Sequence, residues 1–388
     1  MADIHVIVIS SVRPEPTTAG NVIIHRHLVD RPGIRLSVFG DEPRGWHPRT
    51  LIRRFVGKLQ RTRFRKFVED FWVLWGGRWI DPELLGPITA PERTIVLSVA
   101  HGDGFMAAMR FAKKHDLPLV TFFHDWWPDM LDCHAPFKTV LERKFKELAC
   151  ESTLALCVCE GMRESLGSRP NSIVLSPIPG KPPKLPRRSQ NPLKPFKIVY
   201  SGNLREYGPV MGEALEESLK YPEILIQIRG SNPDWTEERK VKMNGNGRWL
   251  DFAPRAELEA WLADADAFLV PMVFDPAKRR RMETSFPSKL AEFAQFGKPI
   301  VLWGPGYCSA VQWARKGDKA VCETNPAPDA LVAKVQNLAE DLASCDHYAN
   351  KAMAAAKEEF NPMLLQDLFR DTLTDVVATT TSQSRTIE

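Results

Sequence analysis

The stretch TSFPSKLAEFAQFGKPIV, residues 284–301, decides how the fold of this chain is interpreted. Either Ser285 or Ser288 can cap the start of a helix, and Gly297 can end it. Helical spacing puts three apolar residues on the side that would face a core: Leu290, Phe293 and Ala294. An apolar run follows over residues 299–303 and is typical of a buried strand. The stretch therefore predicts a helix that leads directly into a strand of an α/β fold.

The exposed side of this predicted helix carries Lys289 and Glu292, three residues apart. The helix N-terminus at Ser288 offers a partial positive charge to a phosphate, and Lys289 adds a full one. The carboxylate of Glu292 can accept two hydroxyl protons of a ribose. Together these groups suit a nucleoside diphosphate. The alternative is an ordinary intrahelical Lys–Glu pair on a solvated face, worth roughly 0.2–0.5 kcal/mol.

The rest of the chain alternates strand-like and helix-like segments. In the first half, apolar runs typical of strands cover residues 4–9, 35–39, 94–99, 119–123 and 154–159, and helical patterns cover residues 21–29, 105–114 and 138–148. In the second half, strand-like runs cover residues 197–202, 224–228, 267–270 and 299–303. This order is typical of parallel sheets covered by helices on both faces. We therefore expect an α/β fold with two Rossmann-like, parallel-sheet domains that face each other across a cleft.

The composition changes between residues 176 and 197. This segment holds seven prolines, six basic residues and no acidic residue. Such a composition predicts an extended, solvated linker. We expect an N-terminal domain over residues 1–180, a linker over residues 181–196 and a C-terminal domain over residues 197–360.

Two loops that follow predicted strands of the first half carry titratable side chains. His124 and Asp125 directly follow the run 119–123, and Asp103 follows the run 94–99. Because ligands bind at the carboxyl ends of parallel strands, these residues would lie where chemistry takes place. The alternative is a polar pair that only caps a strand. The acidic residues, histidine and cysteine that follow are too irregularly spaced to predict a metal site.

A glycine turn follows the first strand-like run of the second half. Gly202 lies at its end and Arg205 three residues later. Backbone N–H groups at such a turn and a guanidinium suit a diphosphate. The loop at residues 10–21 lacks the G-x-G-x-x-G pattern, and the chain has no P-loop motif. The first absence argues against a conventional NAD-binding first half, and the second excludes a P-loop nucleotide hydrolase.

Composition and charge narrow the class of protein further. The 388 residues suit about two domains, and 52 Lys plus Arg against 48 Asp plus Glu give a net charge of only +4. This excess is too small for a general nucleic-acid binder. With no signal peptide or membrane-spanning run recognised, we expect a cytoplasmic protein. The seven cysteines, including Cys157 and Cys159 on one predicted strand, are interpreted as packed thiols.

Residues 284–301 resemble the Ser-x-Lys-x-x-Glu and Gly-Lys-Pro-Ile signature of the GT-B glycosyltransferases, in the group 1, glycogen-synthase-like branch or the membrane-associated glucuronosyltransferase-like branch. The resemblance extends over nearly the whole chain. It implies that the C-terminal domain binds a nucleotide-diphosphate sugar and the N-terminal domain binds the acceptor. It also implies a final helix that returns to the first domain. Residues 361–377 suit that helix, and residues 378–388 would be a disordered tail.

Carried over residue by residue, the resemblance makes Glu292 the ligand of the ribose. Lys289 and Arg205 become the partners of the diphosphate, and Gly202 marks the loop of close approach. His124 would lie near the transferred sugar.

The resemblance leaves the stereochemistry open. Retaining relatives often carry a further glutamate eight residues before the ribose ligand, where this chain has Thr284. An inverting reaction needs a carboxylate that takes the proton of the acceptor hydroxyl, and the candidates are Asp125 and Asp103, of which we favour Asp125. The resemblance implies no metal, and no cofactor is expected besides the donor itself.

A strongly basic segment over residues 44–66 has nine basic residues, no acidic residue and interleaved aromatic residues. A basic amphipathic helix with aromatic residues is typical of a segment attracted to anionic lipid. It could instead hold a soluble anionic acceptor, or form a solvated face over a core stripe. The candidate acceptor- or membrane-binding residues are Arg53, Arg54, Lys58, Arg61, Arg63 and Phe64.

The sequence thus predicts a metal-independent glycosyltransferase of polysaccharide or glycoconjugate biosynthesis, peripheral on the inner face of the membrane. Its partners would be a nucleotide-sugar donor, a glycan or lipid-linked acceptor and an anionic membrane surface, with no nucleic acid. The alternatives are a sugar-nucleotide epimerase on the same fold and a non-catalytic glycan-binding relative.

Overall fold

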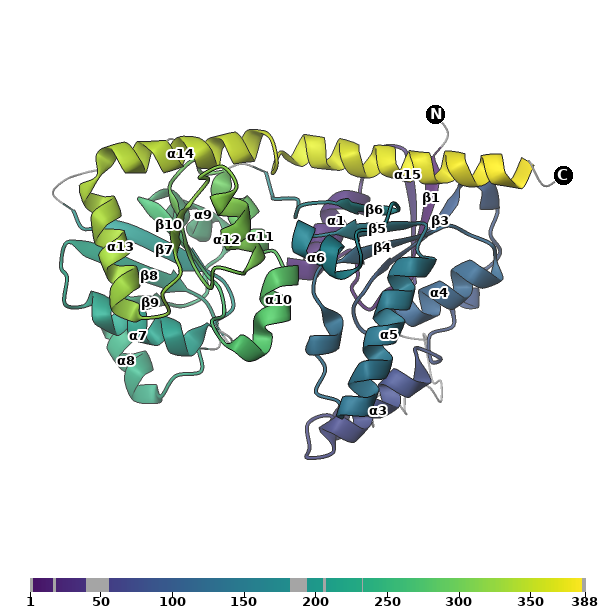
Figure 1. The fold of residues 1–388 in the computed structure, drawn as a ribbon, viewed down its shortest axis with the longest axis horizontal. Coiled ribbons are helices and arrows are strands. Elements are labelled where there is room, and N and C mark those ends of the chain that lie inside the picture. The colour runs from purple at the N-terminus through teal and green to yellow at the C-terminus, as the bar shows by residue number, and fades with distance from the viewer. Residues whose placement is uncertain are drawn as a thin grey trace. The chain divides into compact units, whose positions relative to one another are not determined.

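The structure is a computed structural model that describes residues 3–16, 19–39, 56–181, 194–204, 207–231 and 233–385 (Figure 1). The chain folds into two compact units. The first comprises Met1–Ile178, Thr284–Phe286 and Leu365–Glu388, and the second comprises Pro179–Glu283 and Pro287–Leu364. Each unit is built on one six-stranded parallel sheet, which confirms the predicted pair of Rossmann-like sheets.

The sheet of the first unit has the strand order β2-β1-β3-β4-β5-β6, and every neighbouring pair is parallel. Its central strands lack polar alternation because helices cover both faces, so all five residues of β4 are buried. The strands are β1 (Ile4–Val8), β2 (Ile34–Val38), β3 (Thr94–Val99), β4 (Leu119–Phe123), β5 (Leu154–Cys157) and β6 (Ser172–Val174).

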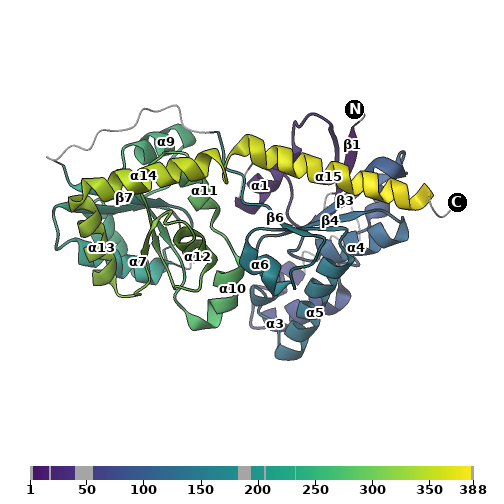
Figure 2. The ribbon, with the colours of Figure 1, turned by 45° about the horizontal axis from the view of Figure 1, so that its top comes forward.

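Two hydrophobic clusters cover the two faces of this sheet. Alternate residues of β1 belong to different clusters, Ile7 to one and Val6 and Val8 to the other. The Ile7 cluster contains residues of α4 and α5, and the other contains residues of α1 and of the last helix (Figures 1 and 2). The helices are α1 (Ala19–Leu28), α3 (Arg65–Trp75), α4 (Gly104–Lys114), α5 (Ala135–Glu151) and α6 (Glu160–Ser165), with 3₁₀ turns at Pro82–Leu85, Pro91–Arg93 and Trp127–Asp129.

The sheet of the second unit has the order β12-β11-β10-β7-β8-β9 and is also parallel. Its strands are β7 (Phe196–Ser201), β8 (Ile224–Arg229), β9 (Trp249–Leu250), β10 (Ala267–Pro271), β11 (Ile300–Trp303) and β12 (Val321–Glu323). Its helices are α7 (Gly208–Ser218), α8 (Glu237–Gly245), α9 (Arg255–Ala263), α10 (Arg279–Thr284), α11 (Ser288–Ala294), α12 (Ser309–Arg315), α13 (Pro328–Glu340) and α14 (Leu342–Lys357), with a 3₁₀ turn at Pro276–Lys278.

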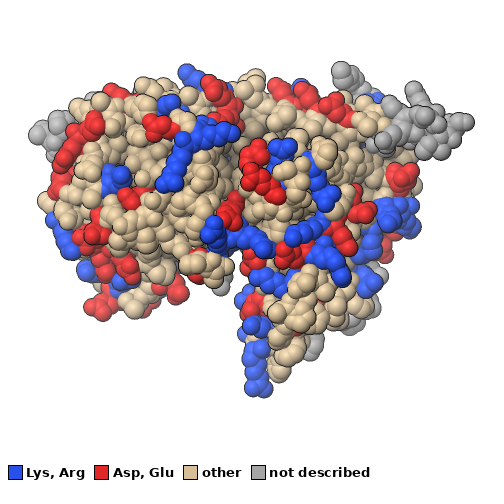
Figure 3. All heavy atoms as spheres, viewed as in Figure 1, with Lys and Arg blue, Asp and Glu red and all other residues tan. Residues whose placement is uncertain are grey.

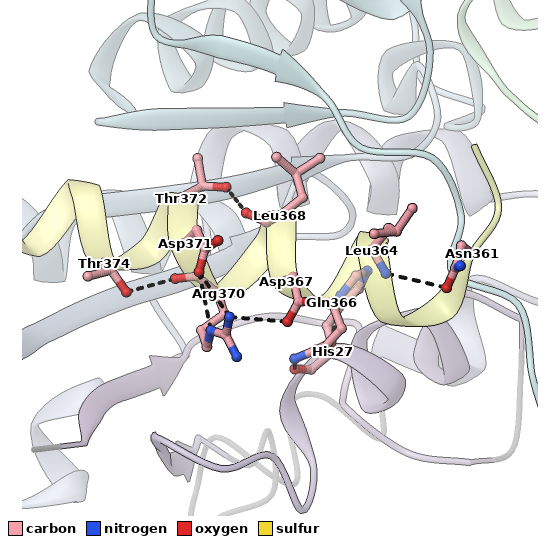
Figure 4. A network of polar contacts seen from close by, with 10 residues as sticks. All are labelled: His27, Asn361, Leu364, Gln366, Asp367, Leu368, Arg370, Asp371, Thr372 and Thr374. Carbon is pink, nitrogen blue, oxygen red and sulfur yellow. Dashed lines mark hydrogen bonds and ion pairs between the residues drawn. The ribbon is translucent and has the colours of Figure 1, made fainter. Parts of the chain in front are cut away.

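The last helix, α15 (Pro362–Arg385), completes the core of the first unit although it follows the whole second unit in sequence. Four of its apolar residues recur at helical spacing and are buried in the cluster that contains Val6 and Val8: Leu365, Phe369, Leu373 and Val376. His27 of α1 lies against the same helix. Its ring contacts the Gln366 side chain at 3.3 Å, and the Gln366 amide donates to the His27 carbonyl at 3.0 Å (Figure 4).

Several predicted boundaries differ from the observed ones. β5 ends at Cys157, two residues before the predicted end, because Cys159 already precedes α6. α15 runs to Arg385 rather than to residue 377, so the predicted disordered tail at 378–388 is helical over most of its length. Residues 182–193, most of the predicted linker, lie outside the described residues.

All seven cysteines are free thiols, and burial raises the pKa of Cys157 to about 12. Among the described residues, none of the helices is long and apolar enough to cross a bilayer.

Candidate active site

The signature helix α11 packs its apolar side onto the second sheet, as its spacing predicts. Leu290, Phe293 and Ala294 are buried, and the ring of Phe293 stacks on Phe268 of β10 with centroids 4.5 Å apart. Ser288, Lys289 and Glu292 are half-buried. The sequence correctly predicts which side of the helix carries the polar residues.

The ends of α11 differ from the prediction. Pro287 takes the N-cap position without a side-chain hydrogen bond, and Ser288 is the first helical residue. Neither Ser285 nor Ser288 therefore caps the helix through its hydroxyl. The helix ends at Ala294, and Gly297 lies three residues further on in the left-handed region, with φ 58°.

Glu292 has a partner that the sequence did not indicate. Its two carboxylate oxygens each lie 3.3 Å from the backbone N–H of Gly180, which donates to them. An ionised carboxylate has about four acceptor positions and can accept from several donors at once. Gly180, the last residue of the predicted N-terminal domain, belongs to the second unit together with the signature helix.

Gly202 lies directly after β7, where the backbones of two strand-end loops meet. Its N–H donates to the Arg229 carbonyl at 3.0 Å, and a Cβ on Gly230 would lie 1.9 Å from the Gly202 carbonyl oxygen. A Cβ on Gly202 itself would lie 2.5 Å from the hydroxyl of Tyr200. Both glycines are thus required by close packing within the protein. Arg205, the second predicted residue of this loop, lies outside the described residues.

His124 and Asp125 follow β4 at the carboxyl edge of the first sheet, as predicted. The pKa of His124 is lowered to about 4, chiefly by burial and to a smaller extent by His101, while Asp125 opposes the shift. Burial also lowers the pKa of His101, whose ring lies 3.8 Å from that of Trp127. Both imidazoles are therefore uncharged at neutral pH. Such rings can donate or accept a hydrogen bond without adding charge.

Asp125 also accepts a hydrogen bond from the hydroxyl of Ser285, at 2.6 Å. Ser285 belongs to a tripeptide that the structure assigns to the first unit. The neighbours of Ser285 have contacts there too, since the Thr284 carbonyl accepts from the thiol of Cys159 at 3.4 Å and Phe286 packs on the apolar core. The predicted helix cap is instead a partner of the predicted base.

Asp103 has a different environment from Asp125. Its Oδ1 accepts from the Ser11 hydroxyl at 3.2 Å, and that hydroxyl accepts from the N–H of Gly104 at 3.1 Å. A Cβ on Gly104 would lie 2.4 Å from the Ser11 backbone nitrogen. Asp103 therefore ties the loop after β3 to the loop after β1.

Three residues that contact the predicted site residues were missed by the sequence analysis: Ser11, His101 and Ser285. A signal existed for the first two, because both follow apolar strands as His124 does. For Ser285 there was none, since its pairing with Asp125 joins residues 160 positions apart. Among the described residues, no group of three or more His, Cys, Asp and Glu side chains has the arrangement to hold a metal ion.

The structure describes four of the six candidate membrane-binding residues. Arg53 and Arg54 lie outside the described residues. Lys58, Arg61, Arg63 and Phe64 are exposed in the segment that precedes α3, and the Arg63 guanidinium lies 5.2 Å from the centre of the Phe64 ring.

Three features together define the GT-B class. The chain has two Rossmann-like units, polar residues at the carboxyl ends of their strands, and a last helix that completes the first unit. Solved glycosyltransferase structures have this fold. A trehalose-6-phosphate synthase studied with bisubstrate glycomimetics is similar with a TM-score of 0.63 and 15% identity, over 96% of this chain and 99% of that one. HepE from Anabaena, solved with UDP and glucose, has a TM-score of 0.59 and 14% identity over 96% and 99%. TarM has a TM-score of 0.53 and 10% identity over 74% of this chain. The match spans 56% of the length of TarM.

The family model described as glycosyl transferases group 1 matches residues 195–341. No curated protein matches the chain in sequence. The chain therefore has the GT-B fold, and the match to the group 1 glycosyltransferases covers most of its second unit. The branch within this class stays a prediction.

Proposed function

We propose that the protein transfers a sugar from a nucleoside diphosphate sugar to a hydroxyl group of a glycan or lipid-linked acceptor, in the synthesis of a polysaccharide or glycoconjugate. The observation that carries this proposal is the family match over residues 195–341, because it contains every described residue of the predicted donor site. These are Gly202, Ser288, Lys289 and Glu292. HepE, which has the same fold, was solved with UDP and glucose.

In this proposal the donor is held by the second unit. Lys289 compensates the charge of the diphosphate, which becomes the leaving group, and Arg205 assists it. Glu292, half-buried on α11, accepts the hydroxyl protons of the ribose. No metal is required by this arrangement, because side-chain cations take the charge of the diphosphate.

The first unit supplies the acceptor side. Asp125 acts as the general base that takes the proton of the acceptor hydroxyl in an inverting reaction. The Ser285 hydroxyl occupies Oδ1 of Asp125 and leaves Oδ2 for the acceptor. The uncharged His124 contacts hydroxyls of the transferred sugar. The trehalose-6-phosphate synthase neighbour is described as transferring with retention, and a retaining reaction would not require this base.

We further propose that the protein works at the inner face of a membrane as a peripheral protein. The exposed Lys58, Arg61 and Arg63 support this proposal, because each basic side chain near an anionic surface contributes about 1 kcal/mol. The cytoplasmic location predicted from the sequence belongs to the same proposal.

The experiment that tests the donor site is a thermal-shift screen against nucleoside diphosphates and their sugars. A ligand that binds only the native state raises the melting temperature, by an amount equivalent to about 2.7 kcal/mol at a hundred times its Kd. A rise with one nucleoside diphosphate and its sugar supports the proposal. No rise across the panel contradicts it.

A further inference from the structure

Helix α3 has its two carboxylates inside and the aromatic side chains of Phe67 and Phe71 outside. Two carboxylates on its inner side are buried, those of Glu69 and Asp70. Asp70 accepts from the backbone N–H of His134 at 2.8 Å and from its ring Nδ1 at 2.5 Å, and Glu69 accepts from the backbone N–H of Asp132. These bonds fix α3 to the chain segment that precedes α5. Since the acidic side is anchored to the protein, the opposite side must face outward.

The outward side of α3 and the residue before it form an apolar surface. Phe64, Phe67, Phe71 and Leu74 recur at spacings of three, four and three, and are 46%, 64%, 40% and 55% exposed. At the end of this surface the rings of Phe71, Trp75 and Trp79 cluster, with centroids 4.8–5.7 Å apart. Four adjacent exposed apolar side chains on one helix face are uncommon in a protein without a partner there.

Three cations gather at the C-terminal end of α3: Arg78, Arg110 and Lys144. Lys144 donates to the Val73 carbonyl at 2.6 Å and Arg110 to the Gly76 carbonyl at 2.5 Å. Both cationic groups lie within 4 Å of the position that a Cβ on Gly76 would take. Among the described residues, no carboxylate forms an ion pair with any of the three.

The three cations influence one another. Burial and then Arg78 lower the pKa of both Arg110 and Lys144, and Arg110 and Arg143 lower that of Lys144 further. The opposing charges are those of Asp103, which acts on Arg110, and Glu147, which acts on Lys144. Such a cluster of like charges is stabilised when an anion binds to it. Phosphate is an anion that suits guanidinium and ammonium groups together.

The apolar surface therefore has cations at both ends. Lys58, Arg61 and Arg63 precede it, and the cluster of Arg78, Arg110 and Lys144 follows it. Figure 3 shows Lys and Arg side chains at the tip and along the border of the lobe that carries α3, next to an uncharged area. An apolar face bordered by basic and aromatic residues has the composition of a helix that lies in the interface of an anionic bilayer.

We propose that the outward face of α3 enters the surface of an anionic membrane, and that Arg78, Arg110 and Lys144 bind the phosphate group of an anionic lipid. Phe67, Phe71 and Leu74 lie among the acyl chains near the headgroups, and Trp75 and Trp79 lie at headgroup level. The purpose of this membrane binding rests on the proposed function, because it would hold the enzyme beside a lipid-linked acceptor.

Co-sedimentation with vesicles tests the surface. The full-length protein should bind vesicles of phosphatidylcholine and phosphatidylglycerol, and bind phosphatidylcholine alone much more weakly. A triple Phe67→Ser, Phe71→Ser, Leu74→Ser variant should bind the anionic vesicles at least about tenfold more weakly. A triple Arg78→Gln, Arg110→Gln, Lys144→Gln variant should lose about 100-fold of the binding to anionic vesicles.

Each variant has a matched control. Phe252→Ser removes a phenylalanine that is 85% exposed in the second unit, and it should leave vesicle binding unchanged. A triple Lys220→Gln, Lys316→Gln, Lys357→Gln variant changes the net charge by the same amount at exposed positions of the second unit. Circular dichroism and the melting temperature verify that each variant is folded.

Wild-type vesicle binding by both α3 variants would overturn the inference, and so would an equal loss in the controls. A nucleoside diphosphate thermal shift on the same proteins separates the two proposals. If the α3 variants bind the nucleotide normally and lose only the vesicles, both proposals stand. If the wild-type protein binds vesicles through α3 but no nucleotide, the proposed function fails and this inference remains.

Discussion

The hydroxyl of Ser285 donates a 2.6 Å hydrogen bond to Oδ1 of Asp125, across 160 residues of sequence. This bond joins the signature stretch to the carboxylate at the end of β4. It fixes the orientation of the carboxylate, and a fixed carboxylate is what a general base requires.

Asp125→Asn should abolish turnover and leave donor binding intact, because the amide keeps the shape of the side chain but cannot take a proton. Release of nucleoside diphosphate in the presence of acceptor measures turnover, and calorimetry measures donor binding. Full turnover by this variant would rule out Asp125 as the base and favour a retaining reaction.

Ser285→Ala should lower kcat by about tenfold with little change in KM for the donor, since a hydrogen bond to a charged group contributes about 1.5–3 kcal/mol. Ser285→Thr keeps the hydroxyl and should retain most of the activity. Equal losses in both variants would show that the hydroxyl does not act through Asp125.

Glu292→Ala and Lys289→Ala should each weaken donor binding by about tenfold or more, because each removes a charge-assisted contact to the ligand. Glu238→Ala and Lys316→Ala are matched controls at exposed positions of the same unit, and they should bind as the wild type does. Calorimetric titration with the nucleotide found in the thermal-shift screen measures the difference. Unchanged affinity in the Glu292 variant would remove the proposed ribose contact.

His27 should make the first unit less stable in acid. Burial lowers the pKa of His27 to about 3, against an ordinary value of 6.5, although its bond to Gln366 opposes the shift. Between these two values the unfolded chain binds a proton that the native state does not, so the free energy of unfolding falls as the pH falls. The slope is at most about 1.4 kcal/mol per pH unit for this group. Denaturant melts of His27→Phe should show a smaller dependence on pH over this interval than the wild type, and an equal dependence would contradict the assignment.

Leu373→Ala should destabilise the first unit by about 3 kcal/mol, because Leu373 is fully buried against the sheet. Leu368→Ala is the matched control on the same helix, where the side chain is 44% exposed, and it should cost less than about 1 kcal/mol. Urea unfolding followed by circular dichroism compares the two variants. Similar losses would mean that α15 does not form part of the core.

Much of this fold could be predicted from the sequence because strands covered on both faces are continuous apolar runs. Residues 119–123 are such a run, and they correctly predict β4 with His124 and Asp125 at its carboxyl end. Likewise, the spacing of Leu290, Phe293 and Ala294 indicates the buried side of α11. These patterns depend only on local periodicity, which the sequence contains in full.

The remaining features depend on partners that are distant in sequence. Periodicity shows that Phe67 and Phe71 share a face, but not that Asp70 anchors the opposite face to His134 and turns the aromatic residues outward. In the same way, a serine before a helix is typical of a cap, and only the position of Asp125 explains why Ser285 has another partner. Tertiary contacts thus override local rules where a side chain has two possible partners.

The interrupted path of the chain through the first unit determines when that unit can fold during synthesis. The ribosome completes strands β1 to β6 early, yet the residues of α15 that cover one face of their sheet are translated last. Until then Val6, Val8 and Leu97 lack part of the apolar contacts that bury them. The nascent chain therefore exposes an apolar sheet surface of the kind that chaperones bind. Splitting the gene after residue 178 would leave the same defect permanently, so the first unit can be produced alone only if the last two dozen residues are supplied in trans or joined by circular permutation.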